Sequence, residues 1–331
     1  MSVHKQNNSG WFTWEVQPRN RSMSASLGVD LYEFTSKRPR SIKYIILLAK
    51  TLSAIFSKKI SVIYTQNPSI VLSFVAVCLK LCLRRIVIVD AHNAGIYPLE
   101  GKHKFLNLIA RFIARNANLV IVSNKYLAEQ VTNWGGTPFV FPDPIPPIAN
   151  HPTQPPLPAG ENFALFICTW AADEPYFEVI KAAELTPDIA IYVTGNYKNK
   201  LTQDTINSLP NNVRLLGFVS EEEYVHYFSN ALVAIDLTTR DHCLVCGAYE
   251  AAALGVPAIL SDSKVNRDIF NKGFIYTSNY AHDIAISIQT AVSQRQSLAT
   301  EIKQFKQSHN QLIDSLTLEL KHQVNKLQNE S

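Results

Sequence analysis

Short runs of β-branched and other apolar residues alternate along the chain with longer segments that carry apolar residues at helical spacing. The first half contains ISVIYT, RRIVIVDAHN, NLVIVSN and TPFVFPDP, and the second half contains FALFICT, IAIYVTG, VRLLGF, ALVAIDLT, VPAILSD and GFIYTS. Such runs, separated by helical segments, are typical of parallel strands joined by helical crossovers. The pattern therefore predicts an α/β fold.

A proline-rich stretch separates the two halves. Residues 143–162 contain seven prolines, a composition that fits neither a helix nor a central strand. We therefore expect two Rossmann-like, doubly wound domains with a ligand-binding cleft between the carboxyl ends of their strands. The expected limits are 1–145 for the N-terminal domain, 146–162 for the linker, 163–290 for the C-terminal domain, and 291–331 for C-terminal helices that pack partly back on the N-terminal domain.

The uncharged run 60–79 has the length of a membrane span and needs a separate test. A polar turn with a proline, QNPS, interrupts it at 66–69. Because proline and its polar neighbours break regular structure, we expect a strand, then a helix capped at its start, then the strand RRIVIVD.

The five cysteines form no regular framework, and no signal peptide opens the chain. A reducing cytoplasm is the expected compartment. Only MSVHKQNNSG precedes WFTWE, so we expect the usual first strand of the N-terminal sheet to be absent or stunted.

The charge is divided unevenly between the two halves. Residues 1–150 carry a net charge of +11, and residues 151–331 carry −7. In 37–50 and 102–117 the cations interleave with apolar residues at roughly helical spacing. Such segments fit a solvated helix face over a core or a surface that rests on anionic lipid. We do not expect nucleic acid as a partner, because no recognisable nucleic-acid-binding motif accompanies the cations.

The segment DHCLVCGAYE (241–250) allows two interpretations. Cys243 and Cys246, with His242 beside them, suggest a metal or redox site, but a zinc site needs four ligands and no second CxxC occurs. The segment also follows the strand ALVAIDLT and begins a helix, and a helix start at a sheet edge suits an anionic ligand. The second interpretation is the stronger one.

Several segments resemble the GT-B nucleotide-sugar glycosyltransferases. Glu250 and the following AAALGVPAILSD are similar to the EAMACGxPVIxSD segment of that family, and LTTRDHCLVCGAYEAAALG (237–255) resembles the LTxRDHTMQRGAxEAxxLG of bacterial members. DAHNAGIYP, TQNPSIV and CTWAADEPYFEVIKAA look like the DWHN, QNPP and TSWTPDEDF segments of the chitobiosyl-diphosphodolichol β-1,4-mannosyltransferases. The resemblance runs from residue 13 to about residue 276, and it implies the GT-B fold.

The resemblance implies a donor site in the C-terminal domain. Glu250 would hold the donor ribose, because a carboxylate can accept two hydroxyl hydrogen bonds. Hydroxyls, an arginine and the amides of a helix start would stabilise the departing pyrophosphate without a metal. The residues implied in donor and nucleotide binding are Thr169, Trp170, Gly195, Gly217, Phe218, Thr239, Arg240, Asp241, Gly247, Ala248 and Glu250.

Catalytic and acceptor residues are implied as well. The catalytic candidates are His92, Asp90 and His242, although His92 also fits a strand-end histidine whose hydrogen bonds are satisfied by backbone. The acceptor-side candidates are Arg19, Arg21 and Asn93. Cys246 stands where the bacterial members have arginine, and His242 stands where the common retaining families have glutamate.

The sequence thus predicts a glycosyltransferase that moves a sugar from a UDP- or GDP-sugar to a lipid-linked or polysaccharide acceptor. No metal or other cofactor is expected, because the chain has no Asp-x-Asp triplet for holding a divalent cation on a sugar diphosphate. We expect a cytoplasmic protein in peripheral contact with the anionic inner face of the membrane. The alternatives are a catalytically inactive glycosyltransferase-like binding protein and a GT-B sugar-nucleotide epimerase.

Overall fold

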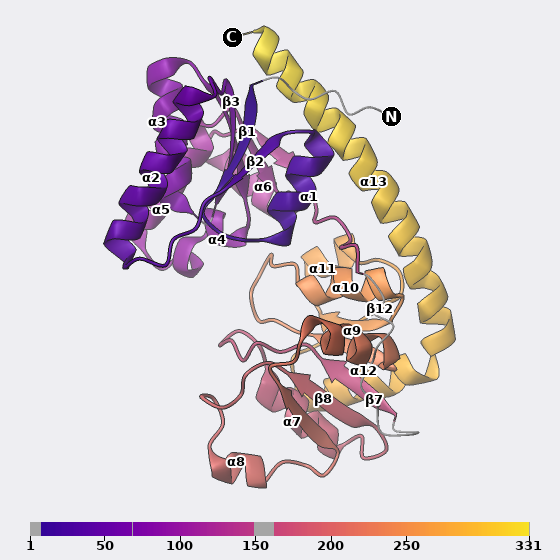
Figure 1. Ribbon diagram of the computed structural model, residues 1–331. Coiled ribbons are helices and arrows are strands. Elements are labelled where there is room, and N and C mark those ends of the chain that lie inside the picture. The colour runs from indigo at the N-terminus through magenta and orange to yellow at the C-terminus, as the bar shows by residue number, and fades with distance from the viewer. Residues whose placement is uncertain (1–7, 68, 149–161, 331) are drawn as a thin grey trace. The chain divides into compact units, whose positions relative to one another are not determined.

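A computed structural model describes residues 8–67, 69–148 and 162–330 of the chain. The chain forms two compact units (Figure 1). One unit holds the chain up to Pro144 together with the segment from Gln311, and the other holds Ile145–Asn310. Most of the expected proline-rich linker, 146–162, lies outside the described residues.

The first unit is built on a parallel six-stranded sheet in its described residues. The strand order is β2-β1-β3-β4-β5-β6. All neighbours pair in parallel register, for example Gly10 with Ile63 and Val89 with Val120. The strands are β1 (Ser9–Thr13), β2 (Asp30–Glu33), β3 (Val62–Asn67), β4 (Ile86–Ala91), β5 (Leu119–Val122) and β6 (Pro138–Val140).

Helices cover both faces of this sheet. The helices α2 (Arg40–Ser57), α3 (Ile70–Leu83), α5 (Lys104–Asn116) and α6 (Lys125–Asn133) pack into one apolar core around Leu47, Val77 and Ile113. The opposite core, around Met23, Leu320 and Val324, receives α1 (Pro18–Leu27) and the C-terminal part of α13 (Arg295–Asn329). The short α4 (Asn93–Ile96) and η1 (Pro98–Gly101) follow β4.

The second unit repeats the plan in its described part, with a parallel six-stranded sheet of order β12-β11-β10-β7-β8-β9. Its strands are β7 (Phe163–Phe166), β8 (Ala190–Thr194), β9 (Val213–Gly217), β10 (Val233–Asp236), β11 (Ala258–Ser261) and β12 (Phe274–Thr277). One face is covered by α7 (Tyr176–Glu184), α12 (Ala281–Ser293) and the short α8 (Gln203–Asn207). The other face is covered by α9 (Glu221–Asn230), α10 (Cys246–Leu254), α11 (Lys264–Ile269) and the first part of α13.

This architecture confirms the predicted fold class and all ten predicted strands. The expectation of an absent or stunted first strand is wrong, because SGWFT forms β1 between β2 and β3. Its residues are all buried, and Trp11 stacks on Tyr64 with ring centroids 5.5 Å apart. A strand buried on both faces shows no polar alternation, and this one contains no β-branched residue before Thr13, so the pattern did not reveal it.

The run 60–79 divides into β3 and α3, as predicted. The expected side-chain cap at the start of α3 is wrong, since Ser69 occupies the N-cap position without donating or accepting a capping hydrogen bond. Among the helices described, none is long and apolar enough to cross a membrane.

Candidate active site

In the second unit, the loop after β7 is organised around one carboxylate. Both oxygens of Glu174 accept hydrogen bonds from the loop, from the Thr169 amide (2.9 and 3.2 Å), the Thr169 hydroxyl (2.7 Å) and the Ala171 amide (3.0 Å). The thiol of Cys168 also lies 3.3 Å from Glu174, and burial together with this carboxylate raises the pKa of that thiol. Backbone amides and a hydroxyl that converge in this way form an anion-binding nest.

The neighbouring Asp173 holds the loop after β10. Its carboxylate accepts a hydrogen bond from the Thr238 hydroxyl (2.8 Å) and forms an ion pair with Arg240 (3.0 Å). Its backbone carbonyl accepts from both the amide (2.8 Å) and the hydroxyl (3.0 Å) of Thr239. Thr239 and Arg240, which were predicted to bind the sugar donor, are therefore already paired with Asp173. Both residues are exposed.

A third carboxylate is that of Asp236, the last residue of β10, and it lies against the start of α10. Its Oδ2 atom accepts the Gly247 amide at 2.8 Å. A Cβ atom at position 247 would collide with that oxygen and with Ile167, so only glycine permits this approach. Burial raises the pKa of Asp236 to about 8, and the nearby charges of Glu250, Glu174 and Asp173 raise it as well. The hydrogen bond from the Gly247 amide acts in the opposite direction and lowers this pKa.

Glu250 lies one turn into α10, and its Oε2 atom accepts a hydrogen bond from the Tyr224 hydroxyl at 2.5 Å. Burial raises the pKa of Glu250, while the hydrogen bond from Tyr224 opposes the shift. The Oε1 atom has no hydrogen-bond partner in the described part of the chain. One carboxylate oxygen of Glu250 is thus engaged and the other is open.

The ends of β7, β8 and β9 approach one another closely. The Gly195 amide donates to the Gly217 carbonyl at 2.9 Å, and a Cβ atom at 195 would collide with the Cys168 carbonyl. Trp170 is fully buried, and its indole donates to the Thr194 carbonyl at 3.0 Å. In contrast, Phe218 is 90% exposed. The buried Trp170 side chain thus anchors the loop after β7 in the core of the unit, whereas the Phe218 ring is exposed to solvent.

The remaining predicted residues of this unit lie in or after the β10–α10 loop. His242 is half-buried in the left-handed region with φ of 57°, and Trp170 in the β7 loop has φ of 61°. Non-glycine residues in this conformation are concentrated at functional sites. Asp241 is exposed and its side chain makes no hydrogen bond or ion pair within the described residues, whereas Ala248 is buried in the core under α10.

In the first unit, the predicted residues Arg19 and Asp90 meet at the carboxyl end of β4. The Arg19 guanidinium donates two hydrogen bonds to the Asp90 carboxylate, at 2.9 and 3.0 Å, and a third to Asp143 at 2.5 Å. Burial alone would raise the pKa of Asp90, but the charge and hydrogen bonds of Arg19, with a contribution from His92, hold it below its usual value. Asp90 is therefore an ionised, buried carboxylate.

His92 lies beside this pair. Its Nε2 atom is 3.7 Å from Asp90 Oδ2, and it is a buried atom without a hydrogen-bond partner in the described residues. The Oδ1 atom of Asn93 is likewise buried and has no hydrogen-bond partner in the described residues. Arg21 lies apart from this cluster, because it is 62% exposed and pairs with Glu33 at 3.0 Å. The structure thus brings together Arg19, Asp90 and His92, and it leaves Arg21 on the surface.

The prediction from sequence missed the side chains that organise both sites. These are the acceptors Asp173, Glu174, Asp236 and Asp143, together with Tyr224, whose hydroxyl donates to Glu250. Tyr224 follows the predicted residues Gly217 and Phe218 by a few positions, and Glu174 lies in CTWAADEPYFEVIKAA, one of the segments that carry the resemblance. A polar residue at the end of an otherwise apolar strand, as in VAID, was the available signal for Asp236.

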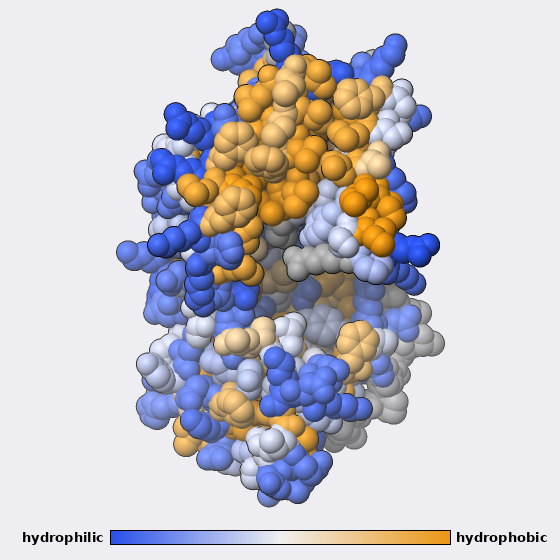
Figure 2. Space-filling view, turned by 90° about the vertical axis from the view of Figure 1, so that its left-hand side faces the viewer, coloured by the Kyte–Doolittle hydropathy of each residue, from blue (hydrophilic) through white to orange (hydrophobic). Residues whose placement is uncertain are grey.

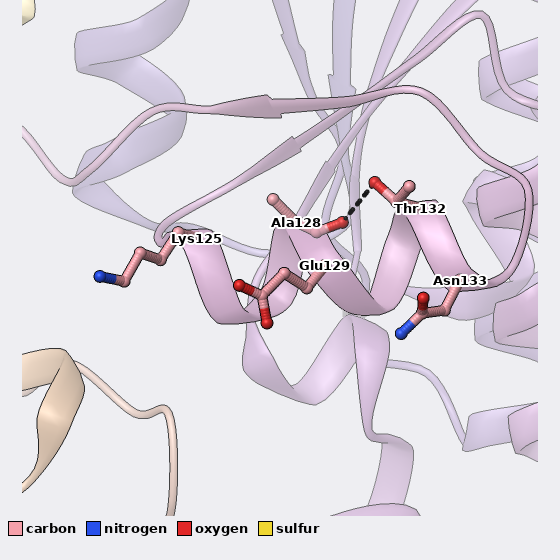
Figure 3. Close-up of a pocket in the computed structure, with 5 residues that line it drawn as sticks. All are labelled: Lys125, Ala128, Glu129, Thr132 and Asn133. Atoms are coloured by element: carbon pink, nitrogen blue, oxygen red, sulfur yellow. Dashed lines mark hydrogen bonds between the residues drawn. The ribbon is translucent and has the colours of Figure 1, made fainter.

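A shallow surface depression of about 340 Å³ lies along α6 in the first unit (Figure 3). It is lined by Lys125, Ala128, Glu129, Thr132 and Asn133, all from one helix, and the Thr132 hydroxyl is turned back onto the Ala128 carbonyl. The predicted catalytic and binding residues do not line it.

Comparison with known proteins finds a family match in the second unit. Residues 148–309 match the model of the family described as glycosyl transferases group 1. No curated protein sequence matches the chain.

Solved structures share the fold over nearly the whole chain. HepE of Anabaena, in complex with UDP-glucose, is 15% identical with a TM-score of 0.69, covering 98% of this chain and all (100%) of its own. Sucrose-phosphate synthase of Thermosynechococcus elongatus is 16% identical with a TM-score of 0.73 and the same coverage. A putative UDP-N-acetylglucosamine 2-epimerase of Listeria monocytogenes is 9% identical with a TM-score of 0.60, covering 90% of this chain and 91% of its own.

These matches confirm the predicted GT-B fold and the predicted class of enzyme. The chain has the GT-B fold, and its residues 148–309 match the glycosyl transferases group 1 family, which supports a glycosyltransferase.

Proposed function

We propose that the chain transfers a sugar from a UDP- or GDP-sugar to a lipid-linked or polysaccharide acceptor. The nest around Glu174 is the observation that carries the donor part. Its two amides and the Thr169 hydroxyl hold carboxylate oxygens at 2.7–3.2 Å, and the same donors suit the oxygens of a diphosphate. HepE binds UDP-glucose in a structure of the same fold, which supports a UDP-sugar as the first donor to test.

The donor groups available to the diphosphate are hydroxyls, amides and one arginine. Thr169, Thr239, Arg240 and the amides of Gly247 and Ala248 at the start of α10 belong to this set. In this proposal they stabilise the charge that develops on the leaving pyrophosphate, and no metal takes part. Glu250 binds the ribose through its open Oε1 atom while Tyr224 holds Oε2 in place.

His92 is the proposed general base toward an acceptor hydroxyl. Its side chain is 26% exposed, and the ionised Asp90, 3.7 Å from the buried Nε2 atom, stabilises the imidazolium that forms when the proton is taken up. Arg19 holds Asp90 in place through two hydrogen bonds. The acceptor is proposed to be presented at a membrane surface, with the enzyme in peripheral contact with its cytoplasmic face.

One observation favours a second candidate, a glycosyltransferase-like protein that binds a partner without turnover. Asp173, Glu174 and Asp236 already engage Arg240, the Thr169 nest and the Gly247 amide. A donor diphosphate must displace at least one of these carboxylates. If none of these carboxylates can be displaced, the protein binds no nucleotide.

The test is a hydrolysis screen with UDP-, GDP- and dTDP-sugars, run beside thermal shift with UDP and GDP. Hydrolysis that survives EDTA and a rise in Tm with the matching nucleotide support the proposal. Loss of turnover on chelation, restored by manganese, contradicts the metal-independent mechanism. If no nucleotide raises the Tm, the second candidate replaces the first.

A further inference from the structure

The first unit presents an apolar outer surface across α2, α3 and α5. Figure 2 shows it as a broad orange area in the upper part of the view, bordered by blue residues. Ile45, Leu108 and Phe105 are 69%, 65% and 64% exposed, and Phe56, Leu81 and Phe74 of α2 and α3 are exposed as well. A contiguous exposed apolar patch on a globular protein marks an interaction site. We call this surface the α2–α3–α5 face.

The core of the unit does not account for these apolar residues, because α2 and α3 bury a different set of apolar side chains. In α2 the residues Leu47 and Ile55 are buried in the core, whereas Ile45 and Phe56 point outward. In α3 the core takes Leu72 and Val77, and the outward positions are again apolar. An amphipathic helix on a soluble surface carries polar residues opposite its core stripe. These helices carry apolar residues on both sides.

The three helices of the face carry charge of one sign. Residues 34–89, which include α2 and α3, contain ten Lys or Arg and no Asp or Glu. Lys58, Lys59 and Arg84 at the ends of these helices are exposed. In α5, Arg111 and Arg115 are exposed and the helix contains no acidic residue. An apolar surface bordered by cations is complementary to a bilayer with anionic headgroups.

We infer that the α2–α3–α5 face is a membrane-docking surface that rests flat on an anionic bilayer. The inference deepens the proposed function and rests on its membrane-bound acceptor. A second copy of the chain is a poorer occupant, because pairing the face with itself would set its cations against one another. No described helix can span a membrane, which leaves insertion to headgroup depth as the mode of contact.

The docking surface includes the edge of the sheet that carries His92. Ile45, Phe74 and Phe105 lie in the first two turns of their helices. These turns lie at the carboxyl edge of the parallel sheet, where β4 ends with Asp90 and Ala91 and His92 begins the following loop. A headgroup-linked acceptor is thereby held at the edge of the unit that carries the proposed base.

Flotation with vesicles tests the surface. The docking variant is Ile45→Gln/Phe105→Gln/Leu108→Gln, and the matched control is Phe177→Gln/Leu185→Gln/Ile286→Gln, three residues of the second unit that are each 48% exposed. We expect the wild-type chain and the control to float with mixed phosphatidylglycerol–phosphatidylcholine vesicles, and the docking variant to bind at least about tenfold more weakly. Because all six residues are exposed, the far-UV circular dichroism and Tm should be unchanged.

A fluorescent label reports the contact directly. Cys82 is exposed on the outer side of α3, and Cys246 is exposed at the start of α10. An environment-sensitive dye on Cys82, in a Cys246→Ser background, should shift to the blue with anionic vesicles. The same dye on Cys246, in a Cys82→Ser background, should not shift.

Three results would overturn the inference. They are flotation of the docking variant equal to wild type, no flotation of the wild type with anionic vesicles, and a vesicle-free dimer that the docking substitutions dissociate. Binding of UDP or GDP, measured on the same samples by thermal shift without vesicles, separates failure of this surface from failure of the proposed donor site.

Discussion

The Arg19 guanidinium donates two hydrogen bonds to the Asp90 carboxylate, at 2.9 and 3.0 Å, across 71 positions of sequence. Both side chains are almost fully buried, at 8% and 2% exposure. Breaking such a pair from one side leaves an uncompensated charge in the core. The pair therefore joins the start of α1 to the end of β4 at the place where His92 is presented.

Arg19→Met should lower the free energy of unfolding by about 3–5 kcal/mol, because Asp90 would stay buried without its partner. Urea denaturation measures the loss. Arg21→Met is the matched control on the same helix, since the exposed Arg21–Glu33 pair contributes at most about 1 kcal/mol. Equal losses in the two variants would contradict the importance assigned to the buried pair, and Arg19→Met/Asp90→Asn should recover part of the loss.

Asp236→Asn should change how stability depends on pH. The pKa of Asp236 in the folded protein is raised to about 8 from an ordinary value of 3.8. Between these values the folded chain holds a proton that the unfolded chain releases, so the stability that the protonated group contributes is complete below about pH 4 and is lost as the pH rises toward about 8. Asparagine keeps an acceptor for the Gly247 amide and does not titrate.

The stability of Asp236→Asn relative to wild type should therefore increase from pH 4 to pH 8. Chemical denaturation across that range measures it. Asp314→Asn, at an exposed position of α13, is the control. Parallel pH profiles for wild type and Asp236→Asn would show that Asp236 titrates normally.

Glu250→Gln should weaken nucleotide binding by roughly tenfold or more, since a hydrogen bond to a charged group contributes about 1.5–3 kcal/mol. Tyr224→Phe should have a smaller effect, because it removes only the group that holds Oε2. Calorimetry with UDP and GDP measures both. Unchanged affinity in Glu250→Gln, with a change in Tm alone, would assign this residue a structural role.

Glu174→Gln should strengthen UDP binding several-fold. Glutamine is neutral and offers one acceptor oxygen, so it competes less well with a diphosphate for the Thr169 and Ala171 donors. Glu184→Gln, at the exposed end of α7, is the control for a general change of charge. Weaker binding in Glu174→Gln would mean that the carboxylate holds the loop in its binding form instead of blocking it.

The spacing of apolar runs was enough to predict ten strands, their parallel pairing and two similar domains, because a strand buried between helical layers must be apolar throughout. β1 escaped prediction because SGWFT is short and contains glycine and aromatic residues. β2 escaped because DLYE is a polar edge strand of four residues. Local sequence carries little signal where neighbouring strands determine the pairing.

The same division holds for the two sites. Sequence alone placed Thr169, Thr239, Arg240 and Glu250 in or after loops at the carboxyl edge of one sheet, since every parallel strand delivers its following loop to that edge. It could not reveal that Asp173 and Glu174 hold the first three, or that Tyr224 holds the fourth. Those pairings depend on distances between side chains from different elements, and only the packing of α7, α9 and α10 on the sheet determines these distances.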